Sequence, residues 1–175
     1  SGGQISKLSV VEKLELIIDY ENRGNNIIAT TQVQDMNDEN IQKIKAIIDK
    51  QLETLKSLGI LTNLHFDENY VCYNYTLKCY SNVENPKKSV RVYQVDFTNG
   101  EDIFNATIDA DTHLIYQYNY YNKKYNEKID EEVYSAILDS GMSLSIIKKK
   151  GFVEKAAFLS TNFGALDNHF YIDGE

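Results

Sequence analysis

The sequence is poor in the features that mark several classes of protein. It has two cysteines, Cys72 and Cys79, which lie in one strand-like run. At ~3.3 Å per residue such a run separates them by ~23 Å, whereas a disulfide needs Cα atoms within about 7 Å, so we expect no intramolecular disulfide. No apolar run approaches the ~20 residues that span a bilayer as a helix. Membrane attachment would therefore require a lipid anchor or a span outside residues 1–175.

Positive charge is scarce. The chain has 18 lysines and arginines against 26 aspartates and glutamates, which gives a formal net charge of −8. An acidic surface repels phosphate groups, so nucleic acids and anionic membrane surfaces are not expected partners. Arginine occurs only at Arg23 and Arg91. We attribute this preference for lysine to the codon usage of an AT-rich genome and give it no functional meaning.

Signatures of catalysis and of metal or cofactor binding are also missing. The three histidines show none of the spacings of zinc sites, and Asp102, Asp109 and Asp111 do not fit the EF-hand calcium loop. No nucleophile elbow, phosphate loop or dinucleotide-binding fingerprint occurs. The sequence therefore predicts no catalytic, cofactor-binding or metal-binding residues, and a protein that is not an enzyme.

The stretch Ser89–Tyr121 predicts a three-stranded antiparallel meander. Asn99-Gly100 separates two alternating runs and suits a two-residue type I′ turn, which would place Val95 opposite Phe104. One face would then carry mostly apolar residues: Tyr93, Val95, Phe97, Phe104, Ala106 and Ile108. The other face would carry polar residues: Gln94, Asp96, Asn105 and Thr107.

The second turn of the meander lies within Asp109–His113. A two-residue loop would direct Gln117 toward the core, whereas a three-residue loop pairs Ile108 with Leu114 and continues the apolar face. Burial of that face favours the three-residue loop. We expect Asp111 to adopt the left-handed conformation within it.

A long helix precedes the meander. Asn37–Leu58 begins with polar residues that can cap a helix and is followed by Gly59, which suits its end. Its apolar stripe suits a helix lying on a sheet and comprises Ile41, Ile44, Ile48, Leu52, Leu55 and Leu58. Before it, Ser6–Tyr20 fits both a helix and a strand, with the helix preferred, and Ile27–Gln34 predicts a strand.

Between the long helix and the meander, Ile60–Phe66 is either a short strand or an irregular bridge, and Tyr70–Tyr80 alternates as a long strand. These elements predict an α+β fold in which the long helix packs on a four-stranded antiparallel meander sheet.

After the meander we expect C-terminal helices at Asp130–Ser140 and Phe152–Leu159 and a docking strand within Gly164–Glu175. We expect one domain over residues 1–175. Its parts would be an N-terminal segment, the helix with the sheet, and a C-terminal helical segment, at 4–36, 37–121 and 122–175.

The segment VYQVDFTNGEDIFNATIDADTHLIYQY (Val92–Tyr118) resembles the hairpin core of PepSY-type domains. In that family a hairpin leads into a Val/Ile-Asp-Ala-x-Thr-Gly turn before a third strand. The residues that match this turn are Ile108, Asp109, Ala110 and Thr112. His113 stands where the family usually has glycine, which bears on the geometry of the turn because glycine adopts positive φ more readily.

The resemblance implies a noncatalytic domain on the outer side of a bacterial membrane, PepSY-like or cystatin-like in fold. The family is similar to peptidase propeptides, so the implied partner is an envelope protein such as a peptidase, and the implied location is extracellular, as a lipoprotein or secreted domain. It offers no catalytic residues to carry over. The alternatives are a small-ligand-binding or enzymatic domain with a pocket between a curved sheet and a helix, and a structural or oligomerisation domain.

Tyrosine is unusually frequent, with 13 copies and no tryptophan. Tyrosine supplies a large contact area with a polar tip, so the tyrosines after the second turn predict a binding groove for a protein or a glycan. The other interpretation is a core whose hydroxyl groups reach its rim. The candidate binding residues are Tyr116, Tyr118, Tyr120, Tyr121 and Tyr125.

Overall fold

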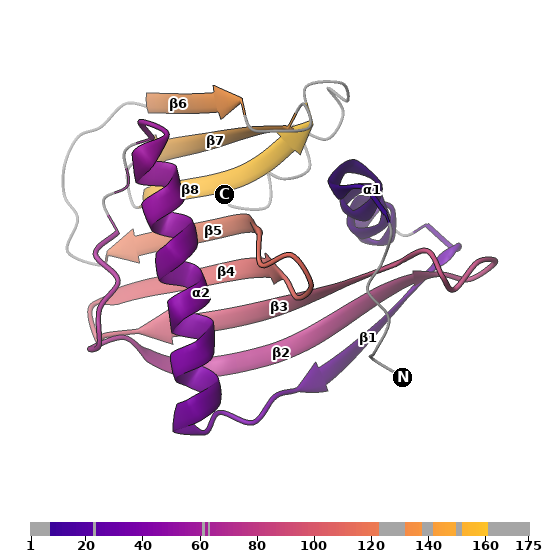
Figure 1. Ribbon diagram of the computed structural model, residues 1–175, viewed down its shortest axis with the longest axis horizontal. Coiled ribbons are helices and arrows are strands. Elements are labelled where there is room, and N and C mark those ends of the chain that lie inside the picture. Colours follow the sequence, from indigo (N-terminus) through magenta and orange to yellow (C-terminus); the bar gives the residue numbers. More distant parts are fainter. Residues whose placement is uncertain are drawn as a thin grey trace.

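The described part of the chain folds into helices α1 and α2 and one antiparallel sheet (Figure 1). The structure is a computed structural model that describes residues 8–22, 24–60, 62, 64–122, 132–137, 142–149 and 152–160, and side chains up to residue 122. None of the helices in these ranges is long and apolar enough to cross a membrane.

The sheet has eight strands, in the order β1-β2-β3-β4-β5-β8-β7-β6, and every neighbouring pair is antiparallel. Their bounds are Ile27–Val33 (β1), Val71–Asn82 (β2), Ser89–Thr98 (β3), Asp102–Asp109 (β4), Ile115–Asn122 (β5), Glu132–Ile137 (β6), Met142–Lys149 (β7) and Phe152–Ser160 (β8). The predicted α+β class and the antiparallel meander are confirmed. The predicted number of four strands is wrong, because β1 extends the sheet on one side and β8, β7 and β6 extend it on the other.

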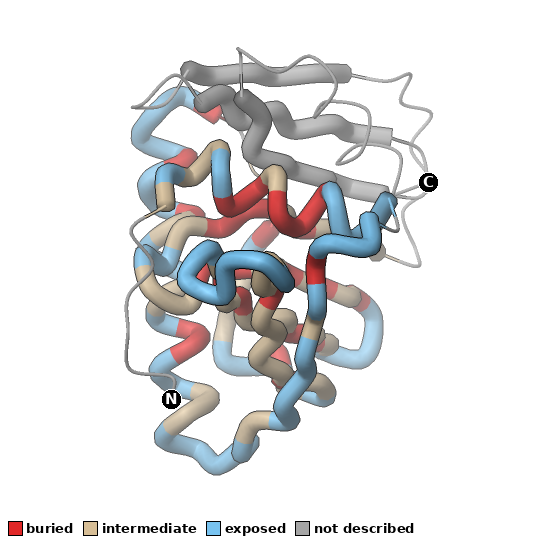
Figure 2. Tube along the Cα trace, turned by 90° about the vertical axis from the view of Figure 1, so that its right-hand side faces the viewer, coloured by how far each residue is buried: buried red, intermediate tan, exposed pale blue. Residues whose placement is uncertain are grey.

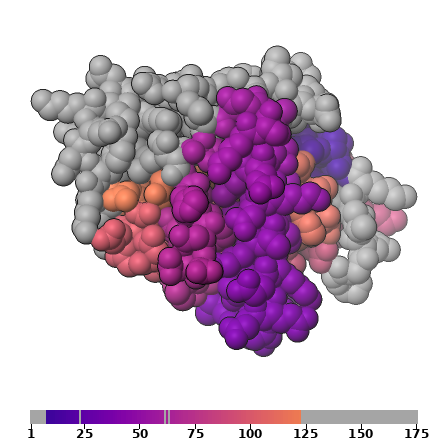
Figure 3. All heavy atoms as spheres, turned by 60° about the vertical axis from the view of Figure 1, so that its left-hand side comes forward, coloured from indigo at the N-terminus to yellow at the C-terminus, as the bar shows by residue number. Residues whose placement is uncertain are grey.

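Helix α2 (Asp38–Ser57) crosses the sheet as predicted and forms a ridge on the molecular surface (Figures 1 and 3). The side chain of Asn37 caps its start by accepting a hydrogen bond from the backbone N–H of Asn40 at 2.9 Å. The chain leaves the helix through Gly59, whose φ of 81° suits glycine. The buried apolar side chains of α2 are Ile44, Ile48, Leu52 and Leu55.

Helix α1 (Val10–Glu21) confirms the helical interpretation of the N-terminal segment. Ser9 and Glu12 form a capping box, in which each side chain accepts a hydrogen bond from the other residue's backbone N–H. The helix packs against β1, β2 and β3. Its buried residues join those of α2 and the sheet in one hydrophobic core.

The connection between α2 and β2 contributes aromatic side chains that pack against the core. It contains no strand in its described residues, so the irregular alternative is the correct one. The ring centroid of Phe66 lies 5.1 Å from those of Tyr70 and Phe97 and 5.3 Å from that of Phe104. Aromatic side chains therefore fill the space between the sheet and α2.

The first hairpin keeps the predicted faces but not the predicted register. Val95 pairs with Ala106 and Phe97 pairs with Phe104, whereas the type I′ turn would have placed Val95 opposite Phe104. The strands are thus shifted by two residues. Because side chains alternate with a period of two, this shift leaves the same residues on the α2 side.

The turn of this hairpin explains the shift. Asn99 accepts hydrogen bonds through its side-chain oxygen from the backbone N–H groups of Glu101 and Asp102, at 3.0 and 2.7 Å. Of the two central residues expected in a type I′ turn only Gly100 has a positive φ, whereas that turn requires both. The asparagine side chain therefore stabilises a longer loop.

The second turn is also longer than predicted. Ile108 pairs with Ile115 instead of Leu114, and a bulge interrupts the pairing of β4 with β5. The backbone N–H of Asp109 donates to the carbonyl of Leu114 at 2.8 Å, and that of His113 donates to the carbonyl of Asp109 at 2.9 Å. These bonds close a turn that is one residue longer than predicted. The alternation of apolar side chains in the sequence does not indicate this extra residue.

His113, and not Asp111, has the left-handed conformation, with a φ of 66°. Its side chain is exposed. Replacing it with glycine should raise the free energy of unfolding by roughly 0.5–1 kcal/mol, because glycine relieves the Cβ strain of this conformation at some entropic cost. Urea unfolding of the two proteins measures the difference. The variant His113→Ala keeps the Cβ and should show no gain, and an equal gain for both variants would contradict this explanation.

The predicted C-terminal helices are wrong. Residues 132–137, 142–149 and 152–160 form β6, β7 and β8, and β8 pairs with β5 along the edge of the meander. The pattern in these segments is compatible with either type of element, and pairing with the available edge of β5 favours strands. The docking strand expected within residues 164–175 lies outside the described residues.

Candidate functional site

The predicted tyrosine groove is not formed by the side chains expected to line it. Tyr116 and Tyr118 are completely buried and Tyr120 is 7% exposed. Tyr121 is half-buried, and Tyr125 lies outside the described residues. The three central tyrosines therefore belong to the hydrophobic core and do not present a binding surface.

Two of these tyrosines bind buried carboxylates. The hydroxyl of Tyr116 donates to Oδ2 of Asp109, which also accepts a hydrogen bond from Nζ of Lys13 at 2.9 Å. The other oxygen of Asp109 accepts from the backbone N–H groups of Asp111 and Thr112, at 2.8 and 2.9 Å. Burial alone would raise the pKa of Asp109, but these hydrogen bonds outweigh it and hold the pKa below the ordinary value.

Asp102 makes a similar arrangement at the other end of β4. Its Oδ2 accepts hydrogen bonds from the hydroxyls of Tyr70 and Tyr120, at 3.0 and 2.9 Å. Burial, and then the hydrogen bond to Asp102, raises the pKa of Tyr120 to about 12. These phenols remain protonated near neutral pH, so they act as hydrogen-bond donors that hold the ends of the strand.

The described residues contain no group of three or more His, Cys, Asp or Glu side chains placed to hold a metal ion. Cys72 and Cys79 are free cysteines on β2, as predicted. Arg91 forms an ion pair with Asp111, which lies in the turn after β4. The charged side chains around this turn therefore hold α1, β3 and the turn together.

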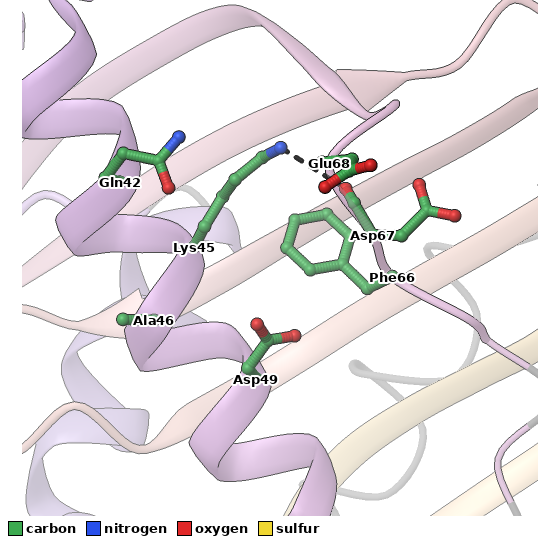
Figure 4. A pocket seen from close by; sticks show the side chains of 7 residues that line it. All are labelled: Gln42, Lys45, Ala46, Asp49, Phe66, Asp67 and Glu68. Carbon is green, nitrogen blue, oxygen red and sulfur yellow. Dashed lines mark hydrogen bonds between the residues drawn. The ribbon is translucent and has the colours of Figure 1, made fainter.

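A shallow pocket lies between α2 and the segment that leads to β2 (Figure 4). It has a volume of about 260 Å³ and is lined by Gln42, Lys45, Ala46, Asp49, Phe66, Asp67 and Glu68. Lys45 lies over the Phe66 ring, 5.6 Å from its centroid, and donates to the carbonyl of Asp67 at 3.3 Å. Burial raises the pKa of Asp49. This pocket is smaller than most ligand sites and does not lie between the sheet and the helix, as the pocket hypothesis expects.

Polar residues of β2, β3, β4 and β5 form a surface on the side of the sheet opposite α2, and we call this surface the open face. Its residues form two rows across β2, β3, β4 and β5, and each row follows the pairing of the strands. The rows are Asn74-Asp96-Asn105-Asn119 and Thr76-Gln94-Thr107-Gln117. All eight side chains are partly exposed, and they alternate along the strands with the buried residues that face α2.

Hydrogen bonds along the first row order its side chains. Asn74 donates through Nδ2 to Oδ2 of Asp96 at 2.8 Å, and Asn119 donates through Nδ2 to Oδ1 of Asn105 at 2.9 Å. Asp96 is the only charged residue of the two rows. The surface thus offers amide and hydroxyl groups that can both donate and accept hydrogen bonds.

The sequence contained most of this surface without marking it as a site. The alternation of the meander already placed Gln94, Asp96, Asn105 and Thr107 together on one face. A polar face is also what water requires of an antiparallel sheet, so the pattern alone gave no functional signal. The rows became visible only when β2 and β5 added their own residues at the same positions.

Comparison with known proteins gives no match to this chain, whether with protein-family models, with curated proteins or with solved structures. The fold and the chemistry of the open face therefore carry the functional proposal.

Proposed function

We propose that this protein is a noncatalytic binding module and that its open face contacts a partner protein. The observation that carries the proposal is the pair of cross-strand rows, which presents eight adjacent polar side chains, seven of them uncharged. Direct neighbours across strands have Cβ atoms roughly 5 Å apart, so the rows form a dense array of hydrogen-bonding groups.

The chemistry of this surface favours recognition at short range. Seven of the eight side chains in the two rows are uncharged, so this surface selects its partner through the geometry of hydrogen bonds more than through long-range attraction. The twisted strands hold the side chains in fixed relative positions, which lowers the entropic cost of binding. These properties suit a protein surface of matching shape.

The partner that we favour is an envelope protein such as a peptidase, and the location that we favour is the outer side of a bacterial membrane. The support is the resemblance of Val92–Tyr118 to PepSY-type hairpins. The His113 turn supports the same assignment, because its φ of 66° is a conformation in which that family's glycine fits without strain. A PepSY-like fold for the whole chain is part of this proposal.

Site-specific photocrosslinking tests the proposal. A benzoylphenylalanine replaces Gln94 at the centre of the open face, and the protein is irradiated in an envelope extract of its source. We expect one dominant crosslinked protein, which mass spectrometry identifies. The control carries the same group at Lys43, whose side chain is 69% exposed on α2. Equal crosslinking at both positions would contradict a role for the open face.

The identified partner, purified, then serves for a binding measurement. Thr107→Lys should raise the Kd at least tenfold, because it places an unpaired charge in the contact. Lys43→Ala should leave the Kd unchanged. A Kd that is insensitive to Thr107→Lys would exclude the open face as the binding surface.

A further inference from the structure

Strand β1 is an edge of the sheet, and no strand of the described residues lies on its outer side. The backbone of Gln34 donates to the carbonyl of Tyr75 at 2.9 Å, and that of Val83 donates to the carbonyl of Asn26 at 2.7 Å. In an antiparallel pair, residues alternate between bonding inward and pointing outward. The even-numbered residues of β1 thus bond to β2. The outward N–H and C=O groups belong to Ile27, Ala29, Thr31 and Val33.

The side chains of β1 leave this edge unprotected. Its sequence, IIATTQV, contains no charged residue and no proline, which are the residues that usually guard an edge strand. Val33 is 76% exposed and Ile28 is 54% exposed. The strand is mostly exposed along its length (Figure 2). An uncharged apolar edge of this kind is suited to pairing with another strand.

We propose that β1 pairs with β1 of a second copy of this chain, antiparallel and about a two-fold axis at Thr30. In this register all four residues with outward-pointing backbone groups form hydrogen bonds in each copy. The backbone of Ile27 pairs with that of Val33 of the second copy, and the backbone of Ala29 pairs with that of Thr31 of the second copy. It brings the exposed Val33 beside Ile27 of the second copy. The proposal rests on the edge of the sheet and is independent of the proposed function of the open face.

Charge supports a second copy as the occupant. The chain carries a net charge of −8, so two copies approach most favourably where neither presents a charge, and β1 is such a place. The first charged residue after the strand, Asp35, would lie opposite the neutral Asn25 of the second copy. The strand is therefore self-complementary in backbone pattern, side-chain size and charge.

The dimer would have a consequence for the rest of the surface. Antiparallel pairing of two edge strands about a two-fold axis normal to the sheet continues one sheet into the other. The open faces of the two copies would then lie on the same side, so two contacts to one partner assembly would reinforce each other.

Disulfide crosslinking tests the register. In a Cys72→Ser, Cys79→Ser background, Thr30→Cys should form an intermolecular disulfide on mild oxidation, because Thr30 lies opposite itself at a non-hydrogen-bonded pair about 4.5 Å apart. The control Gln32→Cys lies opposite Ile28 of the second copy and is too far from its own equivalent to crosslink. Equal crosslinking of both variants, or crosslinking of neither, would overturn the proposal.

The molecular mass in solution tests the dimer itself. Sedimentation equilibrium of the full chain should give twice the chain mass of 20.1 kDa. Thr31→Pro removes an outward N–H without breaking a bond to β2, so it should give the mass of the single chain with an unchanged circular dichroism spectrum. Thr31→Ala keeps that N–H and should remain dimeric. A single-chain mass for the unmodified protein would overturn the proposal.

Discussion

Replacing Asp109 with asparagine should lower the free energy of unfolding by roughly 3–5 kcal/mol, which is the usual cost of removing one partner of a buried ion pair. Asp109 is completely buried, and the side chain of Lys13 beside it is 3% exposed. The variant leaves the lysine ammonium group buried without a counter-charge. It also weakens the hydrogen bonds from Tyr116 and from the two backbone N–H groups that close the turn. Urea unfolding at neutral pH measures the loss.

The effect of this substitution should depend on pH. The pKa of Asp109 is lower in the folded protein than the ordinary value of 3.8, so the carboxylate binds its proton more weakly in the folded state than in the unfolded state. Its contribution is therefore fully present above about pH 4 and is lost as the pH falls through the folded pKa. The difference between the unmodified protein and Asp109→Asn should shrink correspondingly below pH 4. A difference that stays constant down to pH 2 would contradict the role of the charge.

The matched variant is Lys13→Met, which removes the cation but keeps most of the apolar stem. It should cost less than Asp109→Asn, because the carboxylate retains Tyr116 and two backbone donors. The double variant should be less destabilised than the sum of the single variants by about 0.5–3 kcal/mol. Strict additivity would show that the two residues do not interact.

Replacing Phe104 with alanine should also cost roughly 3–5 kcal/mol, because it opens a cavity in the centre of the core. The Phe104 side chain is completely buried, and its ring centroid lies 5.3 Å from that of Phe66 and 5.8 Å from that of Tyr118. The surrounding rings come from the meander and from the connection after α2, so the site cannot collapse by moving one element. Urea unfolding measures the loss.

The neighbouring residue on β4 provides the control. Ile103 points to the opposite side of the sheet and is only partly buried. Ile103→Ala should therefore cost less than half as much as Phe104→Ala. A similar loss of stability in the two variants would contradict the finding that the Phe104 side of β4 is buried and the Ile103 side is not.

The same reasoning applies to the tyrosines that the sequence marked as a binding surface. Tyr118→Ala would remove a completely buried ring, so a loss of binding in that variant would report unfolding and not recognition. Binding experiments on this protein therefore need variants of the open face, such as Thr107→Lys, with the fold verified separately.

Local patterns in the sequence determined the identity of most elements up to residue 122. These patterns depend on residues that are close together in the sequence, so the sequence alone is enough to detect them. They are the polar cap at Asn37, the apolar stripe of α2 and the alternation of β2, β3 and β4. The assignment of residues to the two faces of the meander was correct for the same reason. This assignment stayed correct although the predicted register was wrong by two residues, because side chains alternate along a strand with a period of two.

Tertiary contacts decided what these patterns left open. The turn lengths depended on side chains that bind the backbone, above all Asn99 and Asp109. Asp109 is in turn held in place by Lys13 of α1, which lies 96 residues earlier in the chain. Residues 132–137, 142–149 and 152–160 form strands because β8 can pair with the edge of β5 and β7 and β6 can then follow it in the sheet. Tyr116 and Tyr120 can lie in the core because buried carboxylates accept their hydroxyl hydrogen bonds. Sequence alone could predict which residues are apolar or polar, but only the assembled sheet decided which of them lie together, because pairing between distant strands is a property of the whole fold.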